Sequence, residues 1–121
     1  MKPILFTSIF NGPRNEDFGF CIKKNLELNL FEKIIILFEN YDRTKLDDYL
    51  KFIENNPQIE IRNIIGRPTF KNFFDIANTE FQNKIICIAS PDIYFDNTLE
   101  KLEFCDFNDK IYAITRLRTQ E

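Results

Sequence analysis

Two carboxylates, Asp92 and Asp96, follow directly after an apolar segment in the sequence KIICIASPDIYFD, which spans residues 84–96. In open α/β sheets, ligands bind at the carboxyl ends of the strands, so residues in this position are candidates for a binding site. Carboxylate oxygens are the ligands that Mg²⁺ and Mn²⁺ prefer in proteins. The residue types and their position therefore predict a ligand site with a divalent cation at the end of this strand.

Polar residues also follow the other apolar segments of the chain. If these segments are parallel strands, their carboxyl ends share one rim, and polar residues from four loops meet there. The four loops span residues 11–16, 39–43, 66–69 and 90–96. Arginine guanidinium groups in the loops match phosphate oxygens, and a cation would offset the repulsion between the carboxylates and a phosphorylated ligand. The rim is thus predicted to bind a phosphorylated ligand through a metal.

The composition limits the chemistry that is open to this chain. A length of 121 residues with 44% hydrophobic content suits a single domain over residues 1–121. The absence of histidine excludes Ser-His and Cys-His nucleophile systems and histidine-containing zinc sites. The cysteines, Cys21, Cys87 and Cys105, are widely spaced and odd in number. They predict buried thiols in a reducing compartment, the cytoplasm.

The charge and hydropathy patterns exclude two further classes of partner. A formal net charge of -3, without a basic stripe, argues against nonspecific nucleic-acid binding. The apolar run at the amino terminus is too short for a signal sequence, and no segment approaches the length of a membrane span. We therefore expect neither a nucleic-acid partner nor a membrane span.

Apolar and amphipathic segments alternate along the chain. Continuous apolar runs such as residues 33–38 indicate strands buried on both faces, and apolar residues at helical spacing indicate helices between them. The predicted strands span residues 3–10, 33–38, 59–65, 84–89 and 110–117, and the predicted helices span residues 16–30, 44–55, 70–81 and 97–104. This order predicts an α/β fold, a three-layer sandwich with a mostly parallel, doubly wound, Rossmann-like sheet of about five strands.

Capping signals mark the starts of three predicted helices. Thr69 is the expected N-cap of the helix over residues 70–81, because its hydroxyl can accept a hydrogen bond from the first turn. The other predicted capping pairs are Thr44 with Asp47 and Asn97 with Glu100.

Several segments together resemble a known family. The strand and loop KIICIASPDIYFDNTLEKL, preceded by RPTFKNFFDIANTEF, resembles the nucleotide-binding half of GT-A type glycosyltransferases, of the family 2-like kind. The opening TSIFNGPRNEDFGFCIKKNLELN is similar to the first strand, loop and helix of the same enzymes. The resemblance spans nearly the whole chain. It implies binding of a nucleoside diphosphate sugar through a divalent metal, Mg²⁺ or Mn²⁺, and transfer of the sugar to an acceptor.

The resemblance places the tripeptide Ser90-Pro91-Asp92 at the Asp-x-Asp position of the family, whose acids bind the metal. Serine replaces the first acid, so Asp92 is the remaining candidate metal ligand, with a loop-capping carboxylate as the alternative. For Asp96 we favour the interpretation of an N-cap or turn acid at the start of the next helix.

The resemblance also implies contacts to the nucleotide sugar from other loops. Glu39, directly after the second strand, matches an acid that contacts the nucleoside; a solvated strand end is the alternative. Arg14 is a second candidate, although a surface ion pair with Glu16 explains it as well. The remaining candidates are Thr7 and Ser8 for the base, Arg67 for a phosphate, and Asn78 on the third helix, with exposed side chains as the alternative for Arg67 and Asn78.

Three interpretations of the function remain open at this point. GT-A enzymes use a second half to bind the acceptor and support catalysis, and this chain ends soon after the fifth predicted strand. The chain is then an active transferase, a noncatalytic remnant or interaction module, or a protein whose acceptor site is completed by a homodimer or a separately encoded partner.

Overall fold

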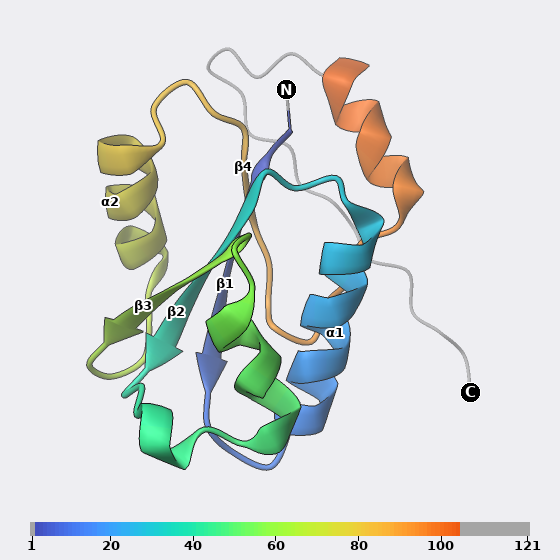
Figure 1. The fold of residues 1–121 in the computed structure, drawn as a ribbon. Helices are drawn as coiled ribbons and strands as arrows, with labels where there is room; N and C mark the ends of the chain where they lie inside the picture. The colour runs from blue at the N-terminus through green and yellow to red at the C-terminus, as the bar shows by residue number, and fades with distance from the viewer. Residues whose placement is uncertain (1, 105–121) are drawn as a thin grey trace.

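A computed structural model describes residues 2–104 of the chain. Four parallel strands form its centre, in the order β3-β2-β1-β4 (Figure 1). The strands are β1 (Ile4–Phe10), β2 (Lys33–Glu39), β3 (Ile59–Ile64) and β4 (Ile86–Ile88). The predicted α/β class and parallel sheet are confirmed. The fifth predicted strand, residues 110–117, lies outside the described residues. So do Arg116 and Arg118, on or just past that strand, for which the sequence leaves open a phosphate contact or a cap of the sheet edge.

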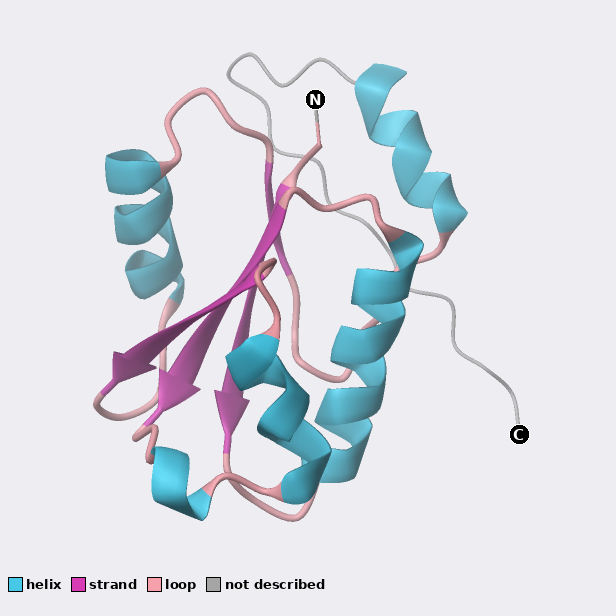
Figure 2. Ribbon diagram, in the orientation of Figure 1, coloured by secondary structure: helices cyan, strands magenta, loops and turns pink. Residues whose placement is uncertain are grey.

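Helices cover both faces of the sheet (Figure 2). They are α1 (Asn15–Leu28), η1 (Arg43–Lys45), η2 (Asp48–Asn55), α2 (Phe70–Glu80) and η3 (Asn97–Phe104). The chain steps from β1 to β2 to β3 in one direction with α1 and η2 on one face, and returns to β4 with α2 on the other. Right-handed crossovers require this change of face when the direction reverses. The reversal places β4 beside β1.

The core consists of two apolar layers, one on each side of β2. Alternate residues of β2 point to opposite faces, so its continuous apolar run contributes to both layers, as is typical of a parallel strand. The layer under α1, η2 and η3 is formed by Leu5, Ile9, Phe18, Ile22, Phe31, Ile34, Ile36, Phe38, Leu46, Leu50, Ile53 and Leu99. The layer under α2 is formed by Ile4, Phe6, Ile35, Leu37, Phe73 and Ala77.

The register of the sheet determines which residues share the rim at the carboxyl ends of the strands. Phe10 lies opposite Glu39, and Glu39 lies opposite Ile64, so β1, β2 and β3 end together. β4 is shorter and pairs only with the first part of β1, ending with a hydrogen bond of 3.0 Å from the Ala89 amide to the Phe6 carbonyl. The chain therefore leaves the sheet beside the middle of β1.

The segment between β2 and β3 differs from the prediction of one helix. It forms two 3₁₀ helices, η1 and η2, separated by Leu46 and Asp47. Both residues have an extended backbone, and the side chain of Leu46 is buried. The predicted capping pair of Thr44 with Asp47 is wrong: Asp42 accepts from the Thr44 amide, and Asp47 accepts from the Tyr49 amide. The two aspartates stabilise short local turns in place of a continuous helix.

The other helix starts follow the sequence more closely. Thr69 is the N-cap of α2, and its hydroxyl and the side chain of Asn72 form a reciprocal capping box. At η3 the capping side chain is Asp96, which accepts a hydrogen bond of 2.9 Å from the Thr98 amide, so Asp96 replaces the predicted pair of Asn97 with Glu100.

Among residues 2–104, none of the helices has both the length and the apolar character that a membrane crossing requires.

Gly19 allows α1 and η2 to pack closely. A Cβ atom at this position would lie 2.5 Å from the carbonyl oxygen of Tyr49, which is a backbone atom and cannot turn away as a side chain can. The close approach brings the buried face of α1 against Leu50 and Ile53 of η2. Glycine is thus required here by the distance between the two helices.

We expect Gly19→Ala to lower the free energy of unfolding by about 1–2 kcal/mol, because overpacking costs more than the helix propensity of alanine regains. Urea unfolding followed by circular dichroism measures this change. Gly12→Ala is the matched control, since its Cβ meets only the exposed ring of Phe10, at 3.1 Å, which can move aside. A Gly19→Ala variant as stable as the wild type would contradict the packing argument.

Candidate functional site

A network of side-chain amides holds the loop that follows β1. The buried Asn15 donates to the Asn11 side-chain oxygen at 2.6 Å and accepts from the Gly12 amide at 3.1 Å. Asn11 in turn donates to the Lys45 carbonyl at 3.1 Å. The bonds to Asn11 and Gly12 give the buried side-chain amide of Asn15 both an acceptor and a donor as partners. They fix the loop so that Arg14 stands at the N-cap of α1.

Arg14 connects this loop to the loop that follows β4. Its Nη1 atom lies 3.2 Å from Oδ2 of Asp92, and its Nε atom lies 3.5 Å from Oδ2 of Asp17. The guanidinium carbon lies 5.7 Å from the centre of the Phe18 ring. The predicted pairing of Arg14 with Glu16 is wrong, because the carboxylates that Arg14 contacts are those of Asp92 and Asp17. Both bridges are at least partly exposed, so each stabilises the fold by about 0–1 kcal/mol.

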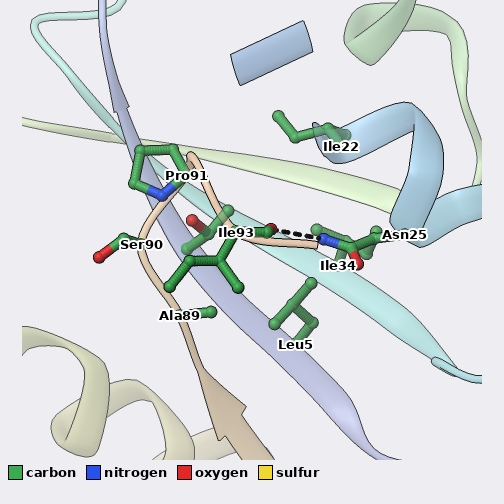
Figure 3. A pocket seen from close by; sticks show the side chains of 9 residues that line it. Leu5, Ile22, Asn25, Ile34, Ala89, Ser90, Pro91 and Ile93 are labelled. Atoms are coloured by element: carbon green, nitrogen blue, oxygen red, sulfur yellow. Dashed lines mark hydrogen bonds between the residues drawn. The ribbon is translucent and has the colours of Figure 1, made fainter. Parts of the chain in front are cut away.

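Asn25 of α1 holds the segment beyond this loop. Its Nδ2 atom donates to the Ile93 carbonyl at 3.2 Å, and its Oδ1 atom accepts from the Phe95 amide at 2.9 Å (Figure 3 shows the first bond). One side-chain amide thereby satisfies a donor and an acceptor of an extended segment, as a neighbouring strand would. The sequence alone does not predict this role of Asn25. The available signal was a polar residue within an apolar stripe.

A small hollow lies between β1, α1 and the loop after β4 (Figure 3). It is too narrow to hold a water molecule. The residues that line it are Leu5, Thr7, Ile22, Asn25, Ile34, Ala89, Ser90, Pro91 and Ile93. Thr7 is 3% exposed, and its hydroxyl is buried without a hydrogen-bond partner in the described part of the chain. Because the hollow is too narrow for water, no solvent molecule can hydrogen-bond to the Thr7 hydroxyl there.

The structure brings together four of the predicted site residues, namely Thr7, Arg14, Ser90 and Asp92. Glu39 lies one strand further along the rim, at the end of β2. Ser8 follows Thr7 on β1 and therefore points to the opposite face of the sheet, the face covered by α2.

Arg67 and Asn78 lie away from this group. Arg67 follows β3, and three strand spacings of about 4.8 Å separate β3 from β4. Asn78 is in the last turn of α2, which runs from the end of β3 back toward the start of β4 (Figure 1). It therefore lies toward the amino ends of the strands, away from the rim at their carboxyl ends. The two residues do not share the junction of β1 and β4.

The donor chemistry at this junction fits a divalent cation only in part. Within residues 2–104 there is no group of three or more histidine, cysteine or acidic side chains that could hold a metal ion. Asp92 offers one carboxylate, which Arg14 already contacts, and Ser90 offers a hydroxyl. Mg²⁺ in nucleotide sites is commonly held by one or two carboxylates together with substrate phosphates. The residues present therefore suit a cation that arrives with a phosphorylated ligand.

The cysteine thiols near the site are kept protonated. Burial raises the pKa of Cys21, the carboxylates of Asp92 and Asp17 raise it further, and Arg14 acts in the opposite direction. Burial raises the pKa of Cys87 to about 11. A thiol acts as a nucleophile through its thiolate form. Neither Cys21 nor Cys87 is therefore suited to covalent catalysis at neutral pH.

Asp96 has the structural role that the sequence indicated. Hydrogen bonds from the Thr98 hydroxyl and amide hold the pKa of its carboxyl below the usual value. Its oxygen is thus engaged in capping η3. Of the two carboxylates after β4, Asp92 is the one that contacts the loop after β1.

Comparison of the chain with protein-family models, with curated proteins and with solved structures finds no match. The resemblance to glycosyltransferases therefore stays a prediction.

We expect Thr7→Val to raise the free energy of unfolding by about 1 kcal/mol, because it replaces a buried, unpartnered hydroxyl with a methyl group of the same shape. Thr7→Ser is the matched control: it keeps the hydroxyl, loses a buried methyl and should lower stability by about 1 kcal/mol. Thermal and urea unfolding measure both. A Thr7→Val variant that is destabilised as much as Thr7→Ser would show that the hydroxyl has a partner.

We expect Asn25→Ala to lower the free energy of unfolding by about 1–3 kcal/mol, because it leaves the Ile93 carbonyl and the Phe95 amide unpaired. Hydrogen exchange should become faster at the Phe95 amide in particular. The control is Asn78→Ala, an exposed helix position where a change of at most about 0.5 kcal/mol is expected. Unchanged protection of the Phe95 amide would contradict the role of Asn25.

Proposed function

We propose that the chain is a GT-A-like domain that binds a nucleoside diphosphate sugar at the junction of β1 and β4. The observation that carries the proposal is the coincidence of two features at this junction. The order of the strands reverses there, which is where open α/β sheets bind ligands at their carboxyl edge. Arg14 and Asp92, a phosphate-binding type and a cation-binding type of side chain, meet across the same junction.

The proposal gives each nearby residue a role that suits its chemistry. The Arg14 guanidinium binds diphosphate oxygens, at the amino end of α1, where the helix dipole also favours an anion. Glu39 accepts hydrogen bonds from the nucleoside, and the Thr7 hydroxyl is a free partner for the base. Arg67 and Asn78, which lie away from the junction, are left out of the proposed site.

In the proposed reaction, an acceptor hydroxyl attacks the anomeric carbon of the sugar while the diphosphate departs. Arg14 stabilises the negative charge that develops on the leaving group. Asp92 and Ser90 would hold a Mg²⁺ or Mn²⁺ ion, which supplies further positive charge to the same oxygens when bound. The acceptor site and the base would come from a homodimer or a separately encoded partner. A cytoplasmic location remains part of the proposal.

One observation favours a second candidate, a noncatalytic interaction module with the same fold. The hollow at the junction is too narrow for a water molecule, and residues 90–93 close over it. A domain that had lost its ligand would be expected to close in this way. The two candidates differ in whether any nucleotide sugar binds.

We expect isothermal titration with UDP, GDP and their sugars to show binding of at least one of them, stronger with Mn²⁺ than without. Asp92→Ala should remove the effect of Mn²⁺, and Arg14→Gln should weaken binding about tenfold or more, because a charge-assisted phosphate contact is lost. Asn78→Ala, on the far side of the sheet, should bind like the wild type. The absence of heat with every ligand would reject the proposal in favour of the interaction module.

A further inference from the structure

Asp92 contacts the guanidinium group of Arg14, which is the group that a phosphate would bind. Nη1 of Arg14 faces Oδ2 of Asp92 at 3.2 Å, and a second carboxylate, Asp17, lies on its Nε. An arginine fork binds carboxylate and phosphate oxygens in the same way. The Asp92 side chain is 27% exposed, so solvent, and a dissolved anion, can reach the pair.

Residues 90–92, which we call the 90–92 turn, are held more loosely than the chain on either side. Before the turn, the Ala89 amide bonds to the Phe6 carbonyl of β1. After the turn, Asn25 holds both Ile93 and Phe95. Among residues 2–104, the turn itself makes a local hydrogen bond, from the Ile93 amide to the Ser90 carbonyl at 3.2 Å, and the ion pair of Asp92 with Arg14. The turn can therefore move without disturbing the sheet or α1.

The lone hydroxyl of Thr7 lies in the hollow that this turn helps to close. Ser90 and Pro91 line the hollow together with Thr7, and the hydroxyl has no partner among residues 2–104. A buried hydroxyl without a partner raises the free energy of the closed form. Opening of the turn would expose this hydroxyl to a ligand or to water and remove that cost.

We propose that Asp92 is a built-in competitor for Arg14, which a phosphate or diphosphate group displaces, so that the 90–92 turn opens above Thr7. The identity of the full ligand as a nucleotide sugar rests on the proposed function, whereas the exchange of anions on Arg14 does not. A diphosphate carries more negative charge and more acceptor oxygens than one carboxylate, so it wins the exchange. A partly exposed ion pair is worth about 0–1 kcal/mol, so the competition lowers the affinity for the anion by no more than about fivefold.

Titration of inorganic pyrophosphate in the presence of EDTA, at low salt, tests this proposal without a metal or a sugar. We expect Asp92→Asn to bind pyrophosphate about two- to fivefold more tightly than the wild type, because the amide competes less well for Arg14. Asp96→Asn is the matched control: it removes the same charge four residues away, and asparagine can still cap η3. It should bind like the wild type. Arg14→Gln should lose binding.

A second measurement follows the turn directly. Pyrophosphate should speed hydrogen exchange at the Ile93 amide of the wild type and leave the Phe95 amide, which Asn25 holds, protected. In Asp92→Asn, the Ile93 amide should exchange rapidly even without pyrophosphate.

Four outcomes would overturn the proposal. The first two are that neither the wild type nor Asp92→Asn binds pyrophosphate, and that Asp92→Asn binds it no more tightly than the wild type. The other two are an equal gain in affinity in Asp96→Asn, and undiminished binding by Arg14→Gln.

Binding of nucleotide sugars is a separate test, which distinguishes this proposal from the proposed function. Tighter pyrophosphate binding by Asp92→Asn, with no nucleotide sugar bound by any variant, would reject the proposed function and leave the competition intact. Loss of the Mn²⁺ effect in Asp92→Ala, with unchanged pyrophosphate binding in Asp92→Asn, would make Asp92 a metal ligand and not a competitor.

Discussion

The right-handedness of crossovers between parallel strands decides where the polar residues of this protein meet. Because β1, β2 and β3 follow one another in one direction, α1 and η2 must share a face, and the return to β4 must carry α2 to the other face. This return brings the loop after β4 beside the loop after β1, 78 residues apart in the sequence at Arg14 and Asp92. The contacts at the junction depend on this constraint on the strand order, which does not itself involve the polar side chains.

In the two loops at the junction, side-chain amides form hydrogen bonds to main-chain groups, as neighbouring strands do within the sheet. Asn15 closes the loop after β1, and Asn25 holds the segment after β4 to α1. Both are nearly fully buried, which is tolerated because their donors and acceptors are paired. Thr7 is the contrast, since its hydroxyl is equally buried and unpaired within the described residues. The junction thus combines a rigid frame of amides with one polar group that the closed form does not satisfy.

Features that depend on local pattern were predictable from the sequence, and features that depend on distant contacts were not. The apolar run of β2, the alternation of strands with helices, and the Thr69 cap of α2 follow from periodicity and capping chemistry. The split of η1 from η2 did not, because burial of Leu46 and turns at Asp42 and Asp47 override the helical pattern. The partner of Arg14 was also missed, because Asp92 comes near only through the order of the strands.

The shortness of β4 has a consequence for molecular recognition. The hydrogen bonds of Ile4 and Phe6 show that alternate residues of β1 direct their main-chain groups toward β4, and by the same period Ser8 and Phe10 do so beyond the point where β4 ends. Within residues 2–104, this part of β1 thus has the main-chain donors and acceptors of an edge strand, although it lies in the middle of the sheet. A flat heterocycle lying there would be recognised by amide and carbonyl groups that every residue type has. Recognition of this kind leaves no motif in the sequence, so side-chain comparison alone would not detect it.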